Sequence, residues 1–86
     1  MKRYTIQYAR PARKELESLP EDIQDRILAA IDDLQDDPRP RGCKKLNGSN
    51  SEYRIRVGNY RVIYEVHEKI VVVLIVRIRD RKDAYQ

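Results

Sequence analysis

The stretch YRIRVGNYRVIYEV, residues 53–66, is the part of the chain that says most about its fold. Apolar residues occupy every second position on both sides of the Gly58-Asn59 pair. Alternation with a period of two predicts strands that bury one face, and a pair of turn-forming residues between two such strands is typical of a two-residue hairpin turn. The stretch therefore predicts a β-hairpin that turns at residues 58 and 59.

A two-residue turn also fixes which residues of the hairpin lie opposite each other. It pairs Val57 with Tyr60 and Arg56 with Arg61, so that Arg54, Arg56 and Arg61 share one face. Like charges directly opposite each other destabilise a sheet, and an anion such as a phosphate between them would offset that cost. A merely solvated face of arginines is the alternative interpretation.

The residues after the hairpin predict a further strand that continues the basic pattern. Residues 70–76, IVVVLIV, are apolar at every position and rich in β-branched side chains, as expected of a central strand that is partly covered on both faces. Arg77 and Arg79 follow with the same parity, and Arg81 comes close behind. These three arginines are candidates to join the same face.

The residues before the hairpin predict one strand and two helices. Residues 4–8 alternate like a strand, Pro11 and Pro20 suit helix starts, and residues 23–34 repeat apolar side chains with helical spacing. Residues 38–52 are rich in turn formers and predict a connecting loop. The order β-α-α-β-β-β predicts an α+β fold: a small twisted antiparallel sheet with two N-terminal helices packed on one face.

Length and composition limit the other possibilities. A chain of 86 residues is expected to form a single domain over residues 1–86. It has no run of about 18 apolar residues, and charges interrupt its N-terminus early, so we expect a cytoplasmic protein without a membrane partner. One cysteine, Cys43, and one histidine make no metal cluster, and we expect no metal or cofactor.

Basic residues concentrate in the second half of the chain. Residues 41–86 carry 11 Lys and Arg against 5 Asp and Glu, whereas the net charge of the whole chain is only +4. Such asymmetry points to a polyanionic partner, most commonly nucleic acid. Lys44 and Lys45 are candidate RNA contacts in the loop, although a solvated loop is an equally good interpretation.

Five tyrosines and the histidine have simpler interpretations. The tyrosines fall on core-facing positions and are expected to pack rather than to stack on bases. They are Tyr4, Tyr8, Tyr53, Tyr60 and Tyr64. His67 lies between Glu65 and Glu68 near a predicted turn, and we expect a surface residue without a catalytic role.

Residues 53–85 resemble the C-terminal half of RelE-type toxins of the RelE/ParE superfamily, and the upstream strand, helix pair and KKLNG loop are similar too. The most informative pieces are the strand with Arg54 and Arg56, the NYR turn with Arg61, and the RKDAY ending with Arg81 and Tyr85. The resemblance implies the toxin of a type II toxin-antitoxin system.

For the mRNA-cleaving members, the resemblance implies metal-independent attack of a ribose 2′-oxygen on the adjacent phosphate. The products are a 2′,3′-cyclic phosphate and a free 5′-hydroxyl. It assigns transition-state stabilisation to Arg61 and Arg81 and proton transfer, or base stacking, to Tyr85. The remaining cations are expected to bind substrate phosphates: Arg54, Arg56, Lys44, Lys45, Arg77 and Arg79.

The resemblance also implies partners. These are a cognate RelB-like antitoxin that covers the basic face, mRNA in the ribosomal A site, the ribosome with its rRNA, and operator DNA only through the toxin-antitoxin complex. One alternative is a ParE-like inhibitor of DNA gyrase that is not a nuclease. Another is a relic that serves only as the antitoxin's partner and corepressor.

Two departures from the family pattern bear on the chemistry. Positions 54 and 56 carry Arg where well-studied RelE-like enzymes have Lys, and an arginine is a poor general base, which shifts proton transfer toward Tyr85. Asp80 stands where many relatives have His before the arginine that matches Arg81. An acid there would pair with an arginine, accept a proton or signal weakened cutting.

Overall fold

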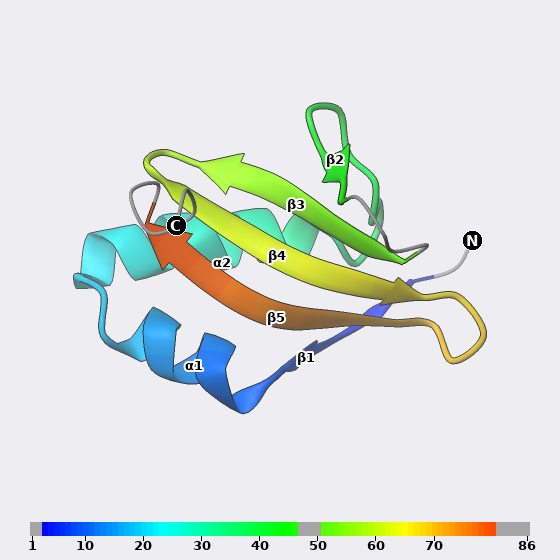
Figure 1. The fold of residues 1–86 in the computed structure, drawn as a ribbon, viewed down its shortest axis with the longest axis horizontal. Coiled ribbons are helices and arrows are strands. Elements are labelled where there is room, and N and C mark those ends of the chain that lie inside the picture. Colours follow the sequence, from blue (N-terminus) through cyan, green and yellow to red (C-terminus); the bar gives the residue numbers. More distant parts are fainter. Residues whose placement is uncertain (1–2, 47–50, 81–86) are drawn as a thin grey trace.

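Two helices and five strands make up residues 3–46 and 51–80, the part of the chain that the computed structural model describes (Figure 1). In chain order they are β1 (Thr5–Tyr8), α1 (Arg10–Glu17), α2 (Glu21–Asp33), β2 (Lys44–Lys45), β3 (Glu52–Val57), β4 (Tyr60–His67) and β5 (Val72–Asp80). The α+β fold predicted from the sequence is confirmed.

The strands form one sheet in the order β1-β5-β4-β3-β2. The hairpin of β3 and β4 has the predicted register, with Val57 opposite Tyr60 and Arg56 opposite Arg61. Gly58 at the turn has a φ of +59°, a left-handed conformation that costs glycine little. The two-residue turn therefore sets the geometry of the basic face.

The sheet is mixed, whereas the sequence predicted an antiparallel one. Three of its four strand pairings are antiparallel, but β1 runs parallel to β5, with Thr5 opposite Val72 and Tyr8 opposite Ile75. The physical reason is that the chain leaves β1 directly into α1, which continues along the same edge of β5. Because β1 pairs with the first part of β5 and α1 lies beside the part that follows, β1 must run in the same direction as β5.

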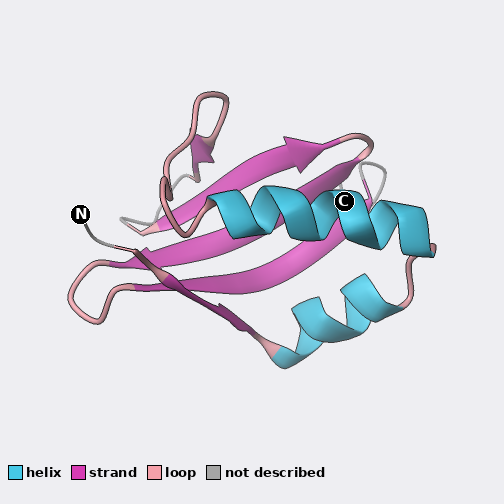
Figure 2. Ribbon diagram, turned by 180° about the vertical axis from the view of Figure 1, so that it is seen from behind, coloured by secondary structure: helices cyan, strands magenta, loops and turns pink. Residues whose placement is uncertain are grey.

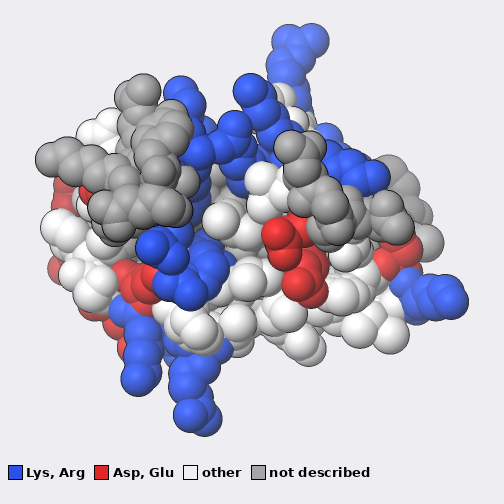
Figure 3. All heavy atoms as spheres, viewed as in Figure 1, with Lys and Arg blue, Asp and Glu red and all other residues white. Residues whose placement is uncertain are grey.

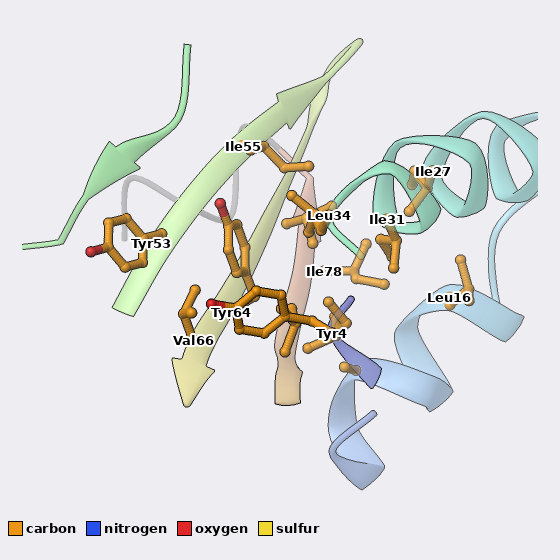
Figure 4. Close-up of a cluster of buried hydrophobic side chains, with 14 residues drawn as sticks. Tyr4, Leu16, Ile27, Ile31, Leu34, Tyr53, Ile55, Tyr64, Val66 and Ile78 are labelled. Atoms are coloured by element: carbon orange, nitrogen blue, oxygen red, sulfur yellow. The ribbon is translucent and has the colours of Figure 1, made fainter. Parts of the chain in front are cut away.

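The helices cover one face of the sheet, as predicted. Helix α2 lies behind the strands in Figure 1 and in front of them in the reverse view of Figure 2, and α1 lies beside β5 at the edge of the sheet. The core between the layers contains fully buried Ile27, Ile31 and Leu34 from α2 and the end of that helix, packed with Tyr64 and Ile75 of the sheet (Figure 4). The face opposite the helices is thus left open.

The tyrosines predicted to pack do so. Tyr4, Tyr53 and Tyr64 are buried, and Tyr8 and Tyr60 are partly buried against the core. The rings of Tyr53 and Tyr64 stack with centroids 6.0 Å apart. These aromatic residues form much of the support beneath the open face.

Arg39 connects the segment between α2 and β3 to the sheet through three side-chain contacts. Its guanidinium lies 5.1 Å from the centroid of the Tyr53 ring, its Nε donates to the Tyr53 hydroxyl at 2.9 Å, and its Nη2 reaches Glu68 at 2.6 Å. The Tyr4 hydroxyl donates to the same carboxylate at 2.6 Å. Within this segment, which the sequence predicted as loop, Lys44 and Lys45 form the short strand β2 along the edge of β3.

The last strand begins later than its apolar run. Ile70 and Val71 lie in the turn before β5, where Ile70 is 67% exposed and Val71 has a φ of +56°. An unbroken apolar run lacks the alternation that would locate the turn, which explains the difference. Residues 72–80 form the strand, which lies between β1 and β4 as predicted for a central strand.

Raising the pH above 10 is expected to destabilise the fold through Tyr64. Burial is the main reason that the pKa of this phenol lies well above its ordinary value of 10. The folded state therefore holds the proton more tightly than the unfolded chain, so this stabilisation is complete below pH 10 and is lost as pH rises toward the folded-state pKa. Within that window each pH unit lowers the free energy of unfolding by about 1.4 kcal/mol.

Urea denaturation at several pH values between 8 and 11.5 measures this loss, with Tyr64→Phe as the comparison. The Phe variant starts less stable because the Tyr64 hydroxyl donates to the Pro38 carbonyl at 2.7 Å, but its stability should fall less steeply with pH. Equal slopes for both proteins would contradict the assignment to Tyr64.

Candidate nucleic-acid interface

The open face of the sheet carries a row of three arginines across neighbouring strands. Arg61 of β4 lies opposite Arg56 of β3 on one side and opposite Arg79 of β5 on the other. We call Arg56, Arg61 and Arg79 the arginine row. Figure 3 shows Lys and Arg side chains gathered on this face. The register thus confirms the predicted opposition of Arg56 and Arg61 and adds Arg79 to it.

Arg61 lies at the centre of the row and is only 9% exposed. Charged side chains are seldom buried to this degree, since desolvation penalises the charged form. On a sheet face an arginine can reach such burial by laying its stem along the neighbouring strands. The result is a largely buried arginine with an arginine opposite it on each neighbouring strand. Guanidinium groups can bind a phosphate in a planar, bidentate way.

A second row lies one step away on the same face. Lys44 of β2 pairs with Arg54 of β3, which lies opposite Ile63, and Ile63 lies opposite Arg77 of β5. Lys45 instead pairs with the core-facing Tyr53, and alternation along β2 directs its side chain away from the open face. Of the predicted cations in the described residues, Lys45 alone is therefore separated from the others.

The open face ends in acidic residues at the far end of the hairpin. Glu52 lies opposite Glu65, and the Glu65 carboxylate is 2.8 Å from Nε2 of His67. These residues precede or follow the arginines along the same strands, so cations occupy the turn end of the face and carboxylates the other end. The His67 side chain is 40% exposed, as predicted for a surface residue. The separation of cations and carboxylates limits where a polyanion can lie on the face.

Glu15 of α1 is the carboxylate that reaches the cations of β5. Its Oε2 accepts from Nη2 of Arg77 at 3.0 Å, both of its oxygens lie 3.3 Å from Nε of Arg77, and Nε of Arg79 is 3.9 Å away. Its Oε1 also accepts from the Ile78 backbone N–H at 2.9 Å. Glu15 was not among the predicted site residues, because no local pattern links a helix residue to a strand residue 62 positions away.

Asp80 does not share the face with the arginine row. It lies opposite Tyr60, whose neighbour across the hairpin is Val57, and strand alternation therefore directs Asp80 toward the helix side of the sheet. The three roles predicted for Asp80, pairing with an arginine, accepting a proton or signalling weakened cutting, stay predictions. Arg81 and Tyr85, the other two residues predicted to be catalytic, lie outside the described residues.

Residues 3–46 and 51–80 contain neither a candidate metal site nor a candidate membrane span. No three His, Cys, Asp or Glu side chains lie together so that they could hold a metal ion. No helix in these residues is long and apolar enough to span a membrane.

These features define a small α+β protein with a cationic sheet face, and comparison with known proteins places it. The family model described as "ParE toxin of type II toxin-antitoxin system, parDE" matches residues 6–85. The chain therefore belongs to the RelE/ParE toxin family and is a RelE-like toxin of a type II toxin-antitoxin system.

Relatives extend over nearly the whole chain. The toxin RelE3 of Methanocaldococcus jannaschii is 32% identical and covers 93% of each chain. The toxin RelG of Mycobacterium tuberculosis is 31% identical over 96% of this chain and 97% of its own length. Among solved structures, the archaeal RelE-RelB complex from Pyrococcus horikoshii is similar with a TM-score of 0.81 and 36% identity, covering 91% of this chain and 94% of that one.

Proposed function

We propose that this toxin is an mRNA endonuclease that acts in the ribosomal A site and thereby inhibits translation. The observation that carries the proposal is the arginine row, with the largely buried Arg61 at its centre. Cleavage proceeds by attack of a ribose 2′-oxygen on the adjacent phosphorus. The P–O5′ bond breaks, the 2′-hydroxyl loses its proton and the 5′-oxygen gains one, leaving a 2′,3′-cyclic phosphate and a 5′-hydroxyl.

We assign the steps of this reaction to the cations of the open face and to two residues of the C-terminal segment. The phosphorane gains negative charge, and guanidinium groups held in place before the reaction stabilise that charge most effectively. Arg61 and Arg81 take this role, Arg54 and Arg56 hold the flanking backbone, and Tyr85 transfers a proton. Lys44 lies beside Arg54 in the sheet and adds a phosphate contact at its edge.

The acidic end of the face gives the RNA a direction. Glu52 and Glu65 repel phosphates at the end away from the hairpin turn. The RNA backbone therefore follows the cations across the strands near the turn and does not run along β4. Arg56, Arg61 and Arg79 then contact consecutive parts of one strand of RNA, or one phosphate together.

A RelB-like antitoxin is the proposed partner that silences the toxin. The structure from Pyrococcus horikoshii is a RelE-RelB complex, and that from Mycobacterium tuberculosis, 30% identical, is the toxin-antitoxin complex RelBE2. A segment that carries carboxylates over the arginine row would neutralise it by charge. Such a complex would also be the form that contacts operator DNA.

Primer extension on a defined mRNA tests the proposal, with purified toxin in the presence and absence of programmed ribosomes. We expect cuts at the A-site codon only when programmed ribosomes are present. Isolated RNA, with or without EDTA, should stay intact. Tyr85→Phe and Arg81→Ala should abolish the cuts. Intact mRNA from a protein that still stops growth would contradict the nuclease.

A non-nuclease toxin that binds DNA gyrase is the second candidate, because the matching family model is that of ParE. The two candidates share the fold and the hairpin, so a supercoiling assay with purified gyrase separates them. Inhibition of supercoiling together with intact mRNA would favour the gyrase-binding toxin.

A further inference from the structure

Glu15 contacts two cations of β5, Arg77 and Arg79. Strand β1 pairs with β5 only as far as Ile75, and α1 lies beside the remainder of that edge. The Glu15 carboxylate bridges this edge by accepting from the Ile78 N–H at 2.9 Å and from the Arg77 side chain at 3.0 and 3.3 Å. Glu15 therefore lies at the edge of the open face, next to β5.

The contacts of Glu15 with Arg77 are the kind that a phosphate would make. A guanidinium binds carboxylate and phosphate oxygens through the same two-pronged set of N–H donors, so one anion excludes the other from that edge of the group. In Arg77 both Nε and Nη2 are directed at Glu15. Arg79 is a weaker partner of the same carboxylate, at 3.9 Å.

We propose that Glu15 is a resident counter-anion that withholds Arg77, and in part Arg79, from RNA. This inference rests on the proposed function in assigning RNA to the open face. Substrate phosphates are then bound by the cations that Glu15 does not contact, Lys44, Arg54, Arg56 and Arg61, and only in part by Arg79. Glu15 acts through Arg77 and Arg79, and is a positioning residue rather than a catalytic one.

As a consequence, fewer cations of the face can bind RNA phosphates than the number of Lys and Arg residues in the sequence suggests. Each phosphate contact that releases counterions makes binding more sensitive to salt, by a slope of about 0.7 in log K against log salt for single strands. When Glu15 keeps an arginine from contacting phosphate, both the salt slope and the non-specific affinity of RNA binding are lower. Glu15 therefore limits binding to RNA that makes other contacts as well.

The test measures the salt dependence of binding to a short single-stranded RNA whose riboses are 2′-O-methylated, so that no cleavage can occur. Glu15→Gln removes the charge but keeps an oxygen that can accept from the Ile78 N–H. Glu17→Gln is the matched control, because Glu17 is an exposed residue of the same helix and its loss changes the net charge equally. Circular dichroism checks that each variant is folded.

We expect Glu15→Gln to bind more tightly than Glu17→Gln and to have a steeper salt slope, by about 0.7 if Arg77 is released and about 1.4 if Arg79 is released with it. Adding Arg77→Gln to Glu15→Gln should remove at least half of the gain, whereas Arg77→Gln alone should leave the slope of the natural sequence unchanged. A purely structural role for Glu15 would not produce this pattern.

Equal slopes and affinities for Glu15→Gln and Glu17→Gln, including the absence of measurable binding by both, would overturn the proposal. A reduced slope for Arg77→Gln alone would also overturn it, because Arg77 would then already contact phosphates. Failure of the proposed function has a different signature. In that case mRNA stays intact on programmed ribosomes. The comparison of salt slopes on uncleavable RNA can still be made and still tests Glu15.

Discussion

Replacing Arg61 by Met should lower the rate of mRNA cleavage on programmed ribosomes by about 100- to 1000-fold. Arg61 is the central member of the arginine row and is held almost out of contact with solvent. Removing one preorganised donor from the site of developing negative charge has an effect of this size in other enzymes, about 3–4 kcal/mol of transition-state stabilisation. Met retains much of the packing of the arginine stem.

The measurement is single-turnover cleavage at saturating toxin, which separates the chemical step from ribosome binding. Arg61→Lys should recover only part of the rate, since an ammonium is a point charge and cannot bind two oxygens in the fork geometry of a guanidinium. Arg10→Ala is the charge-matched control, because Arg10 is exposed at the start of α1. A rate for Arg61→Met within threefold of that of the natural sequence would exclude Arg61 from the reaction.

The opposition of Arg56 and Arg61 could be predicted because it depends only on local rules. A two-residue turn leaves one way to pair the hairpin, and each pairing follows by counting. The structure has that register over the whole hairpin. The same counting places Arg54 on the open face of the sheet. It cannot predict the register between strands that are joined by longer turns, such as β4 and β5.

Features that depend on distant pairings could not be predicted in this way. The parallel neighbour of β5 is β1, from the opposite end of the chain, and nothing in either strand specifies the direction of pairing. The irregularity between Ile63 and Tyr64 of β4 and their partners in β5 likewise shifts the register of the two strands. Arg77 and Arg79 were correctly grouped with the hairpin arginines only because they follow that irregularity.

The contacts of Glu15 could not be predicted from local sequence patterns. In the sequence it is one of several charged residues of a short amphipathic helix, next to the buried Leu16. Its contact with the Ile78 N–H arises because α1 continues along β5 beyond the last residue paired with β1. A carboxylate at this place satisfies an edge amide and two guanidinium groups at once, and only the packing of the helix on the sheet shows it.

Replacing Ile31 by Ala should lower the free energy of unfolding by about 2–5 kcal/mol. Ile31 is fully buried between α2 and the sheet, so truncation loses apolar contact and leaves a cavity beneath the open face (Figure 4). At about 0.05–0.15 kcal/mol per residue, a chain of 86 residues has a total stability of about 4–13 kcal/mol. The substitution therefore removes a large share of what holds the arginine row in place.

Ile70→Ala is the matched control, since it deletes the same atoms from a side chain that is 67% exposed in the turn before β5. It should change stability by less than about 0.5 kcal/mol. Urea denaturation of the isolated toxin measures both variants, and repeating it with the cognate antitoxin tests for rescue. A partner present at 1,000 times its Kd stabilises the folded state by about 4 kcal/mol, enough to offset most of the loss. Equal losses for the two variants would contradict a core centred on α2, because the two substitutions differ only in burial.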